Sequence, residues 1–157
     1  DVSRRLLAEL ELAVVRGNSA EIATLAGRAA EIRGVEAVGG GGGPELAREA
    51  AQALGAVVAV TGSVDHVSDG VTVNAVANGH ELLGAVTGTG CMSTAITGCF
   101  LGVRGDDPLA AATEALVAFG VAGEDAAREA KGPGSFHVAL YDALAALDPQ
   151  SLDVRAR

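Results

Sequence analysis

The sequence has few aromatic residues and few basic ones. Aromatic side chains make up 3% of its 157 residues, and 11 Lys and Arg stand against 20 Asp and Glu, which gives a formal net charge of −9. Nucleic-acid binding relies on clustered Lys and Arg that neutralise phosphates, so this composition argues against a nucleic-acid partner. With 49% apolar and 20% charged residues, the sequence is typical of one globular domain over residues 1–157.

Long apolar runs and cysteines are also scarce. No apolar stretch reaches the roughly 18 residues that a membrane-spanning helix needs, so we expect no membrane partner. The two cysteines, Cys91 and Cys99, are eight residues apart. They would lie about two turns apart on one helix, where they could not easily form a disulfide with each other. The simplest interpretation is a reduced, cytoplasmic protein.

Helical and strand-like patterns alternate over the first 61 residues. Ser3–Glu11 has leucines at helical spacing, and Glu45–Leu54 also has a helical pattern. Leu12–Val15 and Ala56–Thr61 are short apolar runs that indicate buried parallel strands. This alternation predicts an α/β fold with a mostly parallel sheet.

Beyond Thr61 a hairpin is followed by helices. Val64–Ser68 and Val71–Val76 alternate around Asp69-Gly70, which is a strong hairpin signal. Four helical patterns come next: Cys91–Val103, Pro108–Val121, Glu124–Lys131 and Ser135–Leu147. In the first of these helices, Ala95, Ile96, Cys99 and Phe100 share one face, and we expect Cys99 in the core.

The number of strands is low for such a set of helices. Only two or three strands are available to a central sheet, too few to cover the apolar helices that follow. We therefore expect further strands before Asp1, and a fold that is incomplete at its N-terminus.

The sharpest chemical feature is the loop Thr87-Gly88-Thr89-Gly90-Cys91, directly before a predicted helix. Glycines let backbone N–H groups turn toward a ligand, and a helix N-terminus adds donors and partial positive charge. Together they suit a transferring phosphoryl group. Cys91 falls in the first turn, where a thiolate is favoured and could accept a proton from a substrate hydroxyl. The alternative is a tight loop with Cys91 as a small buried filler.

A second candidate site lies at the ends of the two predicted parallel strands. Asn18 and Glu21 share a face of the first helical turn, where their oxygens could hold Mg²⁺ and its waters. The alternative is simple capping of that helix. Arg16 could reach a phosphate, and Thr61 ends a strand where open α/β sheets bind ligands, unless Thr61-Gly62 is an ordinary turn.

Four segments resemble hydroxyethylthiazole kinases, which belong to the ribokinase-like fold, and they do so in the same order: Val14–Gly27, Val57–Gly70, Asn78–Val103 and Ala130–Leu144. The resemblance implies a three-layer α/β/α fold, of which these residues form the C-terminal nucleotide-binding and catalytic portion. It implies transfer of a phosphoryl group from ATP, with Mg²⁺, to the hydroxyl of 4-methyl-5-(2-hydroxyethyl)thiazole in thiamine biosynthesis or salvage. It also implies a homotrimer in the complete enzyme.

The resemblance assigns roles to the glycine loop and to the strand ends. It implies that Cys91 is the catalytic base where other ribokinase-like enzymes carry Asp, and that Gly88 contacts the substrate. The same loop residues, Gly88, Thr89 and Gly90, would form the anion hole. The remaining roles are the magnesium motif on Asn18 and Glu21 and the ATP contacts on Arg16 and Thr61.

Two other interpretations stay open. One is another ribokinase-like enzyme, such as a hydroxymethylpyrimidine kinase or a nicotinamide-nucleotide-hydrate dehydratase, although either would be expected to carry Asp in place of Cys91. The other is an inactive fragment that binds only nucleotide or partner subunits.

Overall fold

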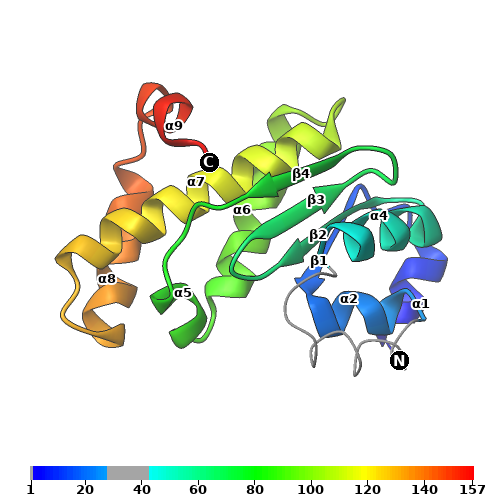
Figure 1. Ribbon diagram of the computed structural model, residues 1–157, viewed down its shortest axis with the longest axis horizontal. Helices are drawn as coiled ribbons and strands as arrows, with labels where there is room; N and C mark the ends of the chain where they lie inside the picture. The colour runs from blue at the N-terminus through cyan, green and yellow to red at the C-terminus, as the bar shows by residue number, and fades with distance from the viewer. Residues whose placement is uncertain (1, 28–42) are drawn as a thin grey trace. The chain divides into compact units, whose positions relative to one another are not determined.

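The computed structural model describes residues 2–27 and 43–157, which fall into two compact units, Asp1–Ala75 and Val76–Arg157 (Figure 1). The predicted α/β class is confirmed, since the described residues form a four-stranded sheet and eight helices. A single domain over residues 1–157 stays a prediction. In the described ranges, no helix is both long enough and apolar enough to cross a membrane.

The first unit contains three helices and the sheet strands, except that the last residue of the fourth strand, Val76, belongs to the second unit. In chain order they are α1 (Val2–Glu9), β1 (Val14–Asn18), α2 (Ser19–Leu25), α4 (Gly43–Leu54), β2 (Val57–Thr61), β3 (Asp65–Ser68) and β4 (Val73–Val76). The strand order is β1-β2-β3-β4. The predicted parallel pairing is confirmed for β1 and β2, while β2 and β3 pair antiparallel, so the sheet is mixed. The expected two or three strands become four because both strands of the predicted hairpin join the sheet.

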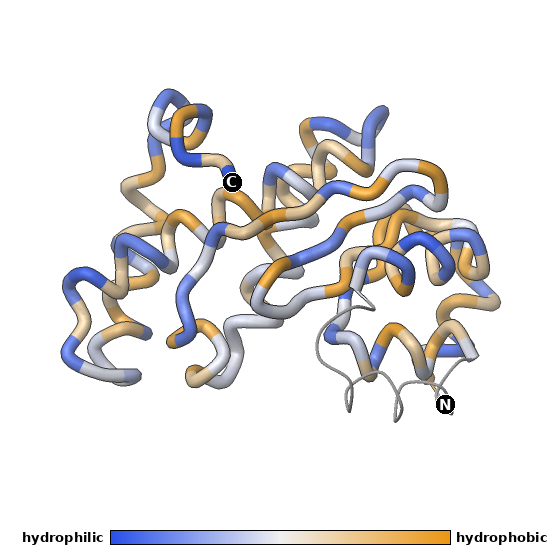
Figure 2. Tube along the Cα trace, viewed as in Figure 1, coloured by the Kyte–Doolittle hydropathy of each residue, from blue (hydrophilic) through white to orange (hydrophobic). Residues whose placement is uncertain are grey.

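The core of the first unit forms where α2 and α4 meet β1 and β2. Val58 on β2 and Ile22 on α2 are fully buried, and Ala47 and Ala50 on α4 face the same cluster. Small alanines let the helix lie close to the strands, and each large buried side chain contributes about 1.5–3 kcal/mol. Figure 2 shows α4 with hydrophobic and hydrophilic residues mixed along its length, as expected of a helix with one buried face.

The predicted hairpin is confirmed between β3 and β4. Oδ1 of Asp69 accepts hydrogen bonds from the backbone N–H groups of Val71 at 2.9 Å and Thr72 at 2.7 Å. These two bonds hold the pKa of Asp69 below its ordinary value. Gly70 follows with a φ of +95°, in the left-handed region that favours glycine.

The second unit is helical. It contains α5 (Leu82–Ala85), α6 (Thr89–Val103), α7 (Pro108–Glu129), α8 (Pro133–Ala145) and α9 (Pro149–Arg155). Its core joins Phe119 and Ala122 of α7 to Phe136 and Leu140 of α8. Figure 1 shows α7 as one long helix, with α6 and α8 along it.

The predicted break near Val121 is wrong, because α7 continues through Gly120 and Gly123 to Glu129. Both glycines are buried positions where another part of the unit approaches closely. A Cβ on Gly120 would stand 2.6 Å from the backbone of Asn78, and one on Gly123 would stand 2.8 Å from Leu83. The glycines therefore permit contact and do not end the helix, and their modest cost in helix propensity is offset by that packing.

The expected buried face of α6 is also wrong. The buried residues are Thr89, Ser93 and Thr97, spaced four apart, whereas Cys99 is exposed and Ile96 is only half-buried. Oγ1 of Thr97 donates to the carbonyl of Ser93 at 2.9 Å. Because Thr97 satisfies its hydroxyl on its own helix, it can be buried, and this stripe of small side chains lets α6 approach α7.

Candidate active site

The glycine-rich loop ends in a left-handed turn at Gly88. Gly88 has a φ of +99° and precedes Thr89, the first residue of α6, so the helix begins two residues earlier than predicted. The buried Thr89 donates its hydroxyl hydrogen to two carbonyls, those of Leu83 at 2.7 Å and Val86 at 3.0 Å. The loop is therefore anchored to α5 through the side chain of Thr89.

The first turn of α6 offers backbone donors. The N–H groups of Thr89, Gly90 and Cys91 have no acceptor within the helix, while that of Met92 donates to the carbonyl of Gly88 at 2.9 Å. The hydroxyl of Thr89 is used inside the unit, so this residue can serve an anion only through its main chain. The turn thus presents N–H groups together with the positive end of the helix dipole, an arrangement that binds anions.

Cys91 is the third residue of α6, and its side chain is exposed. The alternative in which Cys91 is a buried filler is therefore wrong. A thiol in the first turn of a helix, open to solvent, is placed to meet a ligand that is bound at the N–H groups beside it.

The strand ends form the candidate site of the first unit. Parallel pairing places Asn18 at the end of β1 opposite Thr61 at the end of β2. Oγ1 of Thr61 donates to the carbonyl of Gly17 at 3.3 Å, which joins the two strand ends. Arg16 lies two residues before Asn18 on β1, half-buried and opposite Ala59. Arg16, Asn18 and Thr61 thus share the carboxyl edge of this parallel pair.

Asn18 and Glu21 form the capping box that was the alternative interpretation. Oδ1 of Asn18 accepts from the N–H of Glu21 at 2.9 Å, and Oε2 of Glu21 accepts from the N–H of Asn18 at 2.8 Å. A Cβ on Gly17 would stand 3.0 Å from that Oε2, so the carboxylate folds over the end of β1.

The same two residues suit a magnesium ion. Both are exposed, and the capping box does not use Oε1 of Glu21. Amide and carboxylate oxygens are ligands that Mg²⁺ takes while it keeps several waters. Among residues 2–27 and 43–157, no group of three or more His, Cys, Asp or Glu is arranged to hold a metal ion. A magnesium site at Asn18 and Glu21 would have only two side-chain ligands.

Asp65 lies beside the same strand end, although it is not among the site residues predicted from the sequence. Its Oδ1 accepts from the N–H of Gly62 at 2.9 Å and closes the turn after Thr61. Burial raises the pKa of Asp65, against the opposing effects of the Gly62 N–H and of the positive charges of Arg16 and His66. The turn-forming residue types Gly, Ser and Asp within residues 62–65 were the available signal for such a turn.

The structure brings together two sets of predicted residues, each within its own unit. The set in the first unit is Arg16, Asn18, Glu21 and Thr61. The set in the second unit is Gly88, Thr89, Gly90 and Cys91. The first set supplies oxygen ligands and a cation at a sheet edge, and the second supplies N–H donors and a thiol at a helix N-terminus.

Comparison with known proteins identifies similar sequences over nearly the whole chain. The sequence model of the hydroxyethylthiazole kinase family matches residues 1–150. The hydroxyethylthiazole kinase of Rubrobacter xylanophilus is 55% identical over 155 residues, which cover 98% of this chain and 58% of that protein. The one from Thermoanaerobacter pseudethanolicus is 46% identical over 154 residues, covering 96% of this chain and 58% of that protein.

A solved structure shares the fold. The hydroxyethylthiazole kinase protein from Pyrococcus horikoshii is 47% identical, with a TM-score of 0.85 that covers 99% of this chain and 57% of that one. The chain thus spans a little under three fifths of the length of the proteins that it matches.

Proposed function

Because the chain belongs to the hydroxyethylthiazole kinase family, we propose that it is the catalytic part of an enzyme that phosphorylates the hydroxyl of 4-methyl-5-(2-hydroxyethyl)thiazole with ATP. This reaction serves thiamine biosynthesis or salvage. The observation that supports it best is the left-handed turn at Gly88, which leads into a helix N-terminus carrying the exposed Cys91. The chain spans 58% of its relatives, so the proposal concerns an enzyme of their length.

The proposed step is an in-line transfer of the γ-phosphoryl group. The hydroxyl oxygen of the thiazole forms a bond to the γ-phosphorus, the bond from that phosphorus to the bridging oxygen breaks, and ADP leaves. The thiolate of Cys91 accepts the hydroxyl proton and becomes a thiol. Backbone N–H groups of Thr89, Gly90 and Cys91 donate to the phosphoryl oxygens as their charge develops. Gly88 lies against the substrate, where any side chain would intrude.

The strand ends would hold the nucleotide. Arg16 offers a planar guanidinium for a phosphate, and Thr61 lies across the parallel pair from Asn18. Asn18 and Glu21 would hold Mg²⁺ through its waters, and a bound Mg²⁺ neutralises charge on the ATP phosphates. The oxygen Oε1 of Glu21, which the capping box does not use, supports this role.

Three further properties are proposed with the activity. The enzyme is a homotrimer, its residues 1–157 act as one nucleotide-binding and catalytic domain, and it works in the cytoplasm. The two cysteines of the chain are free thiols, which agrees with a reducing compartment.

A second candidate function is nucleotide binding without turnover by these 157 residues alone. It is supported by the coverage of the relatives, which leaves 42% of their length unmatched (100% − 58%). A substrate pocket that needs those residues would leave this chain able to bind nucleotide and unable to catalyse.

The test is an assay of ADP release by a full-length kinase that carries these residues. ADP should appear only when hydroxyethylthiazole and Mg²⁺ are both present, and mass spectrometry should show the thiazole heavier by one phosphoryl group. Hydroxymethylpyrimidine serves as the control acceptor, assayed in place of the thiazole. ADP release with the pyrimidine and none with the thiazole would refute the proposed substrate.

A further inference from the structure

The segment that leads into the glycine-rich loop lies on α7. Asn78 contacts α7 at Gly120, and Leu83 contacts it at Gly123, in both cases so closely that a Cβ on the glycine would clash. Leu83 also supplies one of the two carbonyls that accept from Thr89. A continuous path of contacts therefore runs from α7 through Asn78 and α5 to the first residue of α6.

Glu124, one residue after Gly123 on α7, fixes the start of this path. Its Oε1 accepts from the N–H of Gly79 at 3.0 Å and from Nδ2 of Asn78 at 3.1 Å. Burial works to raise the pKa of Glu124, but these hydrogen bonds and one from Arg157 outweigh it, so the pKa lies below its ordinary value. The carboxylate is thus a charged acceptor for two groups of the approaching segment, and such bonds are stronger than neutral ones.

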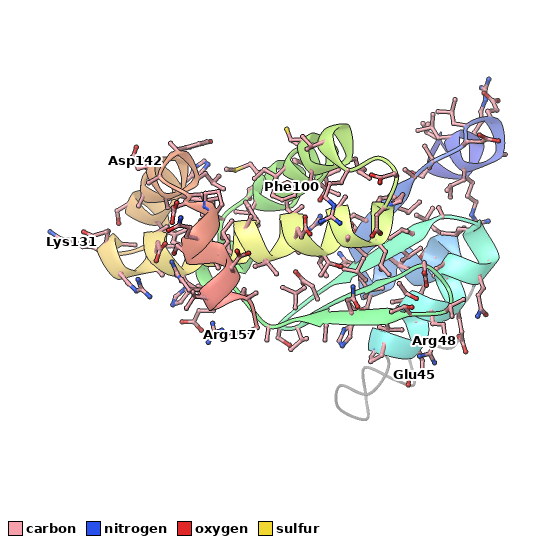
Figure 3. The ribbon with its side chains drawn as sticks, turned by 90° about the horizontal axis from the view of Figure 1, so that it is seen from above. Glu45, Arg48, Phe100, Lys131, Asp142 and Arg157 are labelled. Carbon is pink, nitrogen blue, oxygen red and sulfur yellow. The ribbon has the colours of Figure 1, made fainter. Side chains whose placement is uncertain are left out.

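The last residues of the chain complete the arrangement. Residues 155–157, here called the C-terminal strap, begin at the end of α9 and return to Asn78. Figure 1 shows the C-terminus of the chain at α9, and Figure 3 labels Arg157. The N–H of Arg157 donates to Oδ1 of Asn78 at 2.8 Å, the carbonyl of Arg157 accepts from Ala77 at 2.7 Å, and the carbonyl of Arg155 accepts from Nδ2 of Asn78 at 2.9 Å.

The side chains of the strap hold it to α7. The guanidinium of Arg155 donates to both oxygens of Asp125 at 2.8 and 2.9 Å. That of Arg157 donates to Oε1 of Glu124 at 2.6 Å. Arg155 is only 24% exposed, so its pair with Asp125 is less screened than a surface pair. The match to the family model ends at residue 150, so it does not include the strap.

We propose that Glu124 and the C-terminal strap are positioning elements of the phosphoryl-transfer loop, acting through Asn78 and Leu83 on the first turn of α6. This rests on the proposed function. The donors of that turn must meet the transferring group with sub-ångström accuracy, and a displacement of about 1 Å can cost on the order of 10²-fold in rate. Neither Glu124 nor the strap touches the substrate in this proposal.

The experiment compares four proteins, all as full-length kinase: the unaltered enzyme, Glu124→Gln, the double variant Arg155→Gln with Arg157→Gln, and a control. The control is Arg104→Gln, which breaks another arginine–carboxylate pair on α7, with Glu114, away from Asn78. Hydrogen exchange of the amides of Gly79 and residues 83–91 measures how firmly the glycine-rich loop and the segment before it are fixed. Steady-state kinetics, at a temperature well below each unfolding midpoint, report kcat and KM for ATP.

We expect exchange in those amides to rise in both test variants, and kcat per folded enzyme to fall about tenfold or more with KM for ATP within about twofold. The control should match the unaltered enzyme in both measurements. If the double variant does not fold, Arg157→Gln alone, whose side chain is 61% exposed, should give the same pattern at smaller amplitude.

Two results would overturn the inference: exchange equal to the control, or raised exchange with an unaltered kcat, which would make the strap merely structural. An unaltered enzyme that fails to phosphorylate the thiazole would instead overturn the proposed function. In that case the exchange measurement would still decide whether Glu124 and the strap hold the loop.

Discussion

Replacing Gly120 with alanine tests the closest contact in the second unit. The added Cβ would stand 2.6 Å from the carbonyl carbon and oxygen of Asn78 and 2.7 Å from its Cβ. Asn78 cannot easily move aside, because its side chain is bonded to Glu124, to the carbonyl of Arg155 and to the N–H of Arg157. The substitution must therefore either strain α7 or break these hydrogen bonds.

The expected magnitude follows from opposing terms. Overpacking costs about 1–3 kcal/mol, and loss of two or three hydrogen bonds at about 1 kcal/mol each costs a similar amount. Alanine is better than glycine inside a helix by about 1 kcal/mol. The net loss in unfolding free energy should be about 1–2 kcal/mol, a fall in Tm of roughly 2–8 °C.

The assay is thermal and urea unfolding of a full-length enzyme with three parallel substitutions. Gly98→Ala is the control, since nothing lies within 4 Å of a Cβ at that exposed position on α6, and it should stabilise by about 0.5–1 kcal/mol. Gly123→Ala should fall between the two, because it meets the flexible end of Leu83 and not backbone. If Gly120→Ala is as stable as Gly98→Ala, the packing argument is refuted.

Four further outcomes are expected. Cys91→Ala should lower kcat by about 10²–10⁴ and Cys91→Asp should keep activity, so an unaltered rate in the alanine variant would exclude the base role. Glu21→Gln should raise the Mg²⁺ concentration that gives half the maximal rate, whereas lower stability with unaltered magnesium dependence would leave only the capping box. The pKa values of Glu124 and Asp125 are lowered in the folded state, so these carboxylates stabilise the fold above the unfolded pKa of about 4 and lose that effect as the pH falls through the folded pKa values. Urea unfolding should therefore show that the difference in unfolding free energy between the unaltered enzyme and Glu124→Gln becomes smaller below about pH 4. A difference that does not change with pH would contradict this. The isolated 157 residues, with apolar side chains such as Val103 86% exposed, should self-associate in light scattering and lack kinase activity, and an active monomer would disprove this.

Local patterns predicted the elements that local chemistry determines. The run Ala56–Thr61 became β2, with four consecutive buried residues, and Asp69-Gly70 became the predicted turn. The capping alternative for Asn18 and Glu21 was also correct, since a side-chain oxygen that accepts from an N–H three residues away needs no information from elsewhere in the chain.

The errors in the fold arise where distant residues decide the outcome. Pro108–Val121 and Glu124–Lys131 were predicted as two helices, but Gly123 between them lies within α7, where Leu83, forty residues earlier in the chain, packs against it. The face of α6 was assigned by hydropathy, whereas the buried side is the stripe of Thr89, Ser93 and Thr97. Hydropathy does not reveal that a hydroxyl can bond to its own helix and then be buried.

For the candidate site, the residues of the glycine loop and of the strand ends stay predictions from the sequence. The sequence did not indicate the contacts that support the glycine loop. Asn78 is a buried partner of Glu124 and of the C-terminal strap, and no pattern in the sequence around it indicates these contacts. A contact between positions almost eighty residues apart leaves no periodic signal in a single sequence.

The shared carboxylate of Glu124 has a consequence for how this sequence can vary. Asn78, Glu124 and Arg157 bond to one another in a closed set, so the cost of changing one depends on which residues stand at the other two. Effects of substitutions here should be epistatic, with a second exchange restoring part of what the first one lost. Among descendants of this protein, substitutions at these three positions should then occur together, whereas residues on the exposed helix surfaces should change independently of one another.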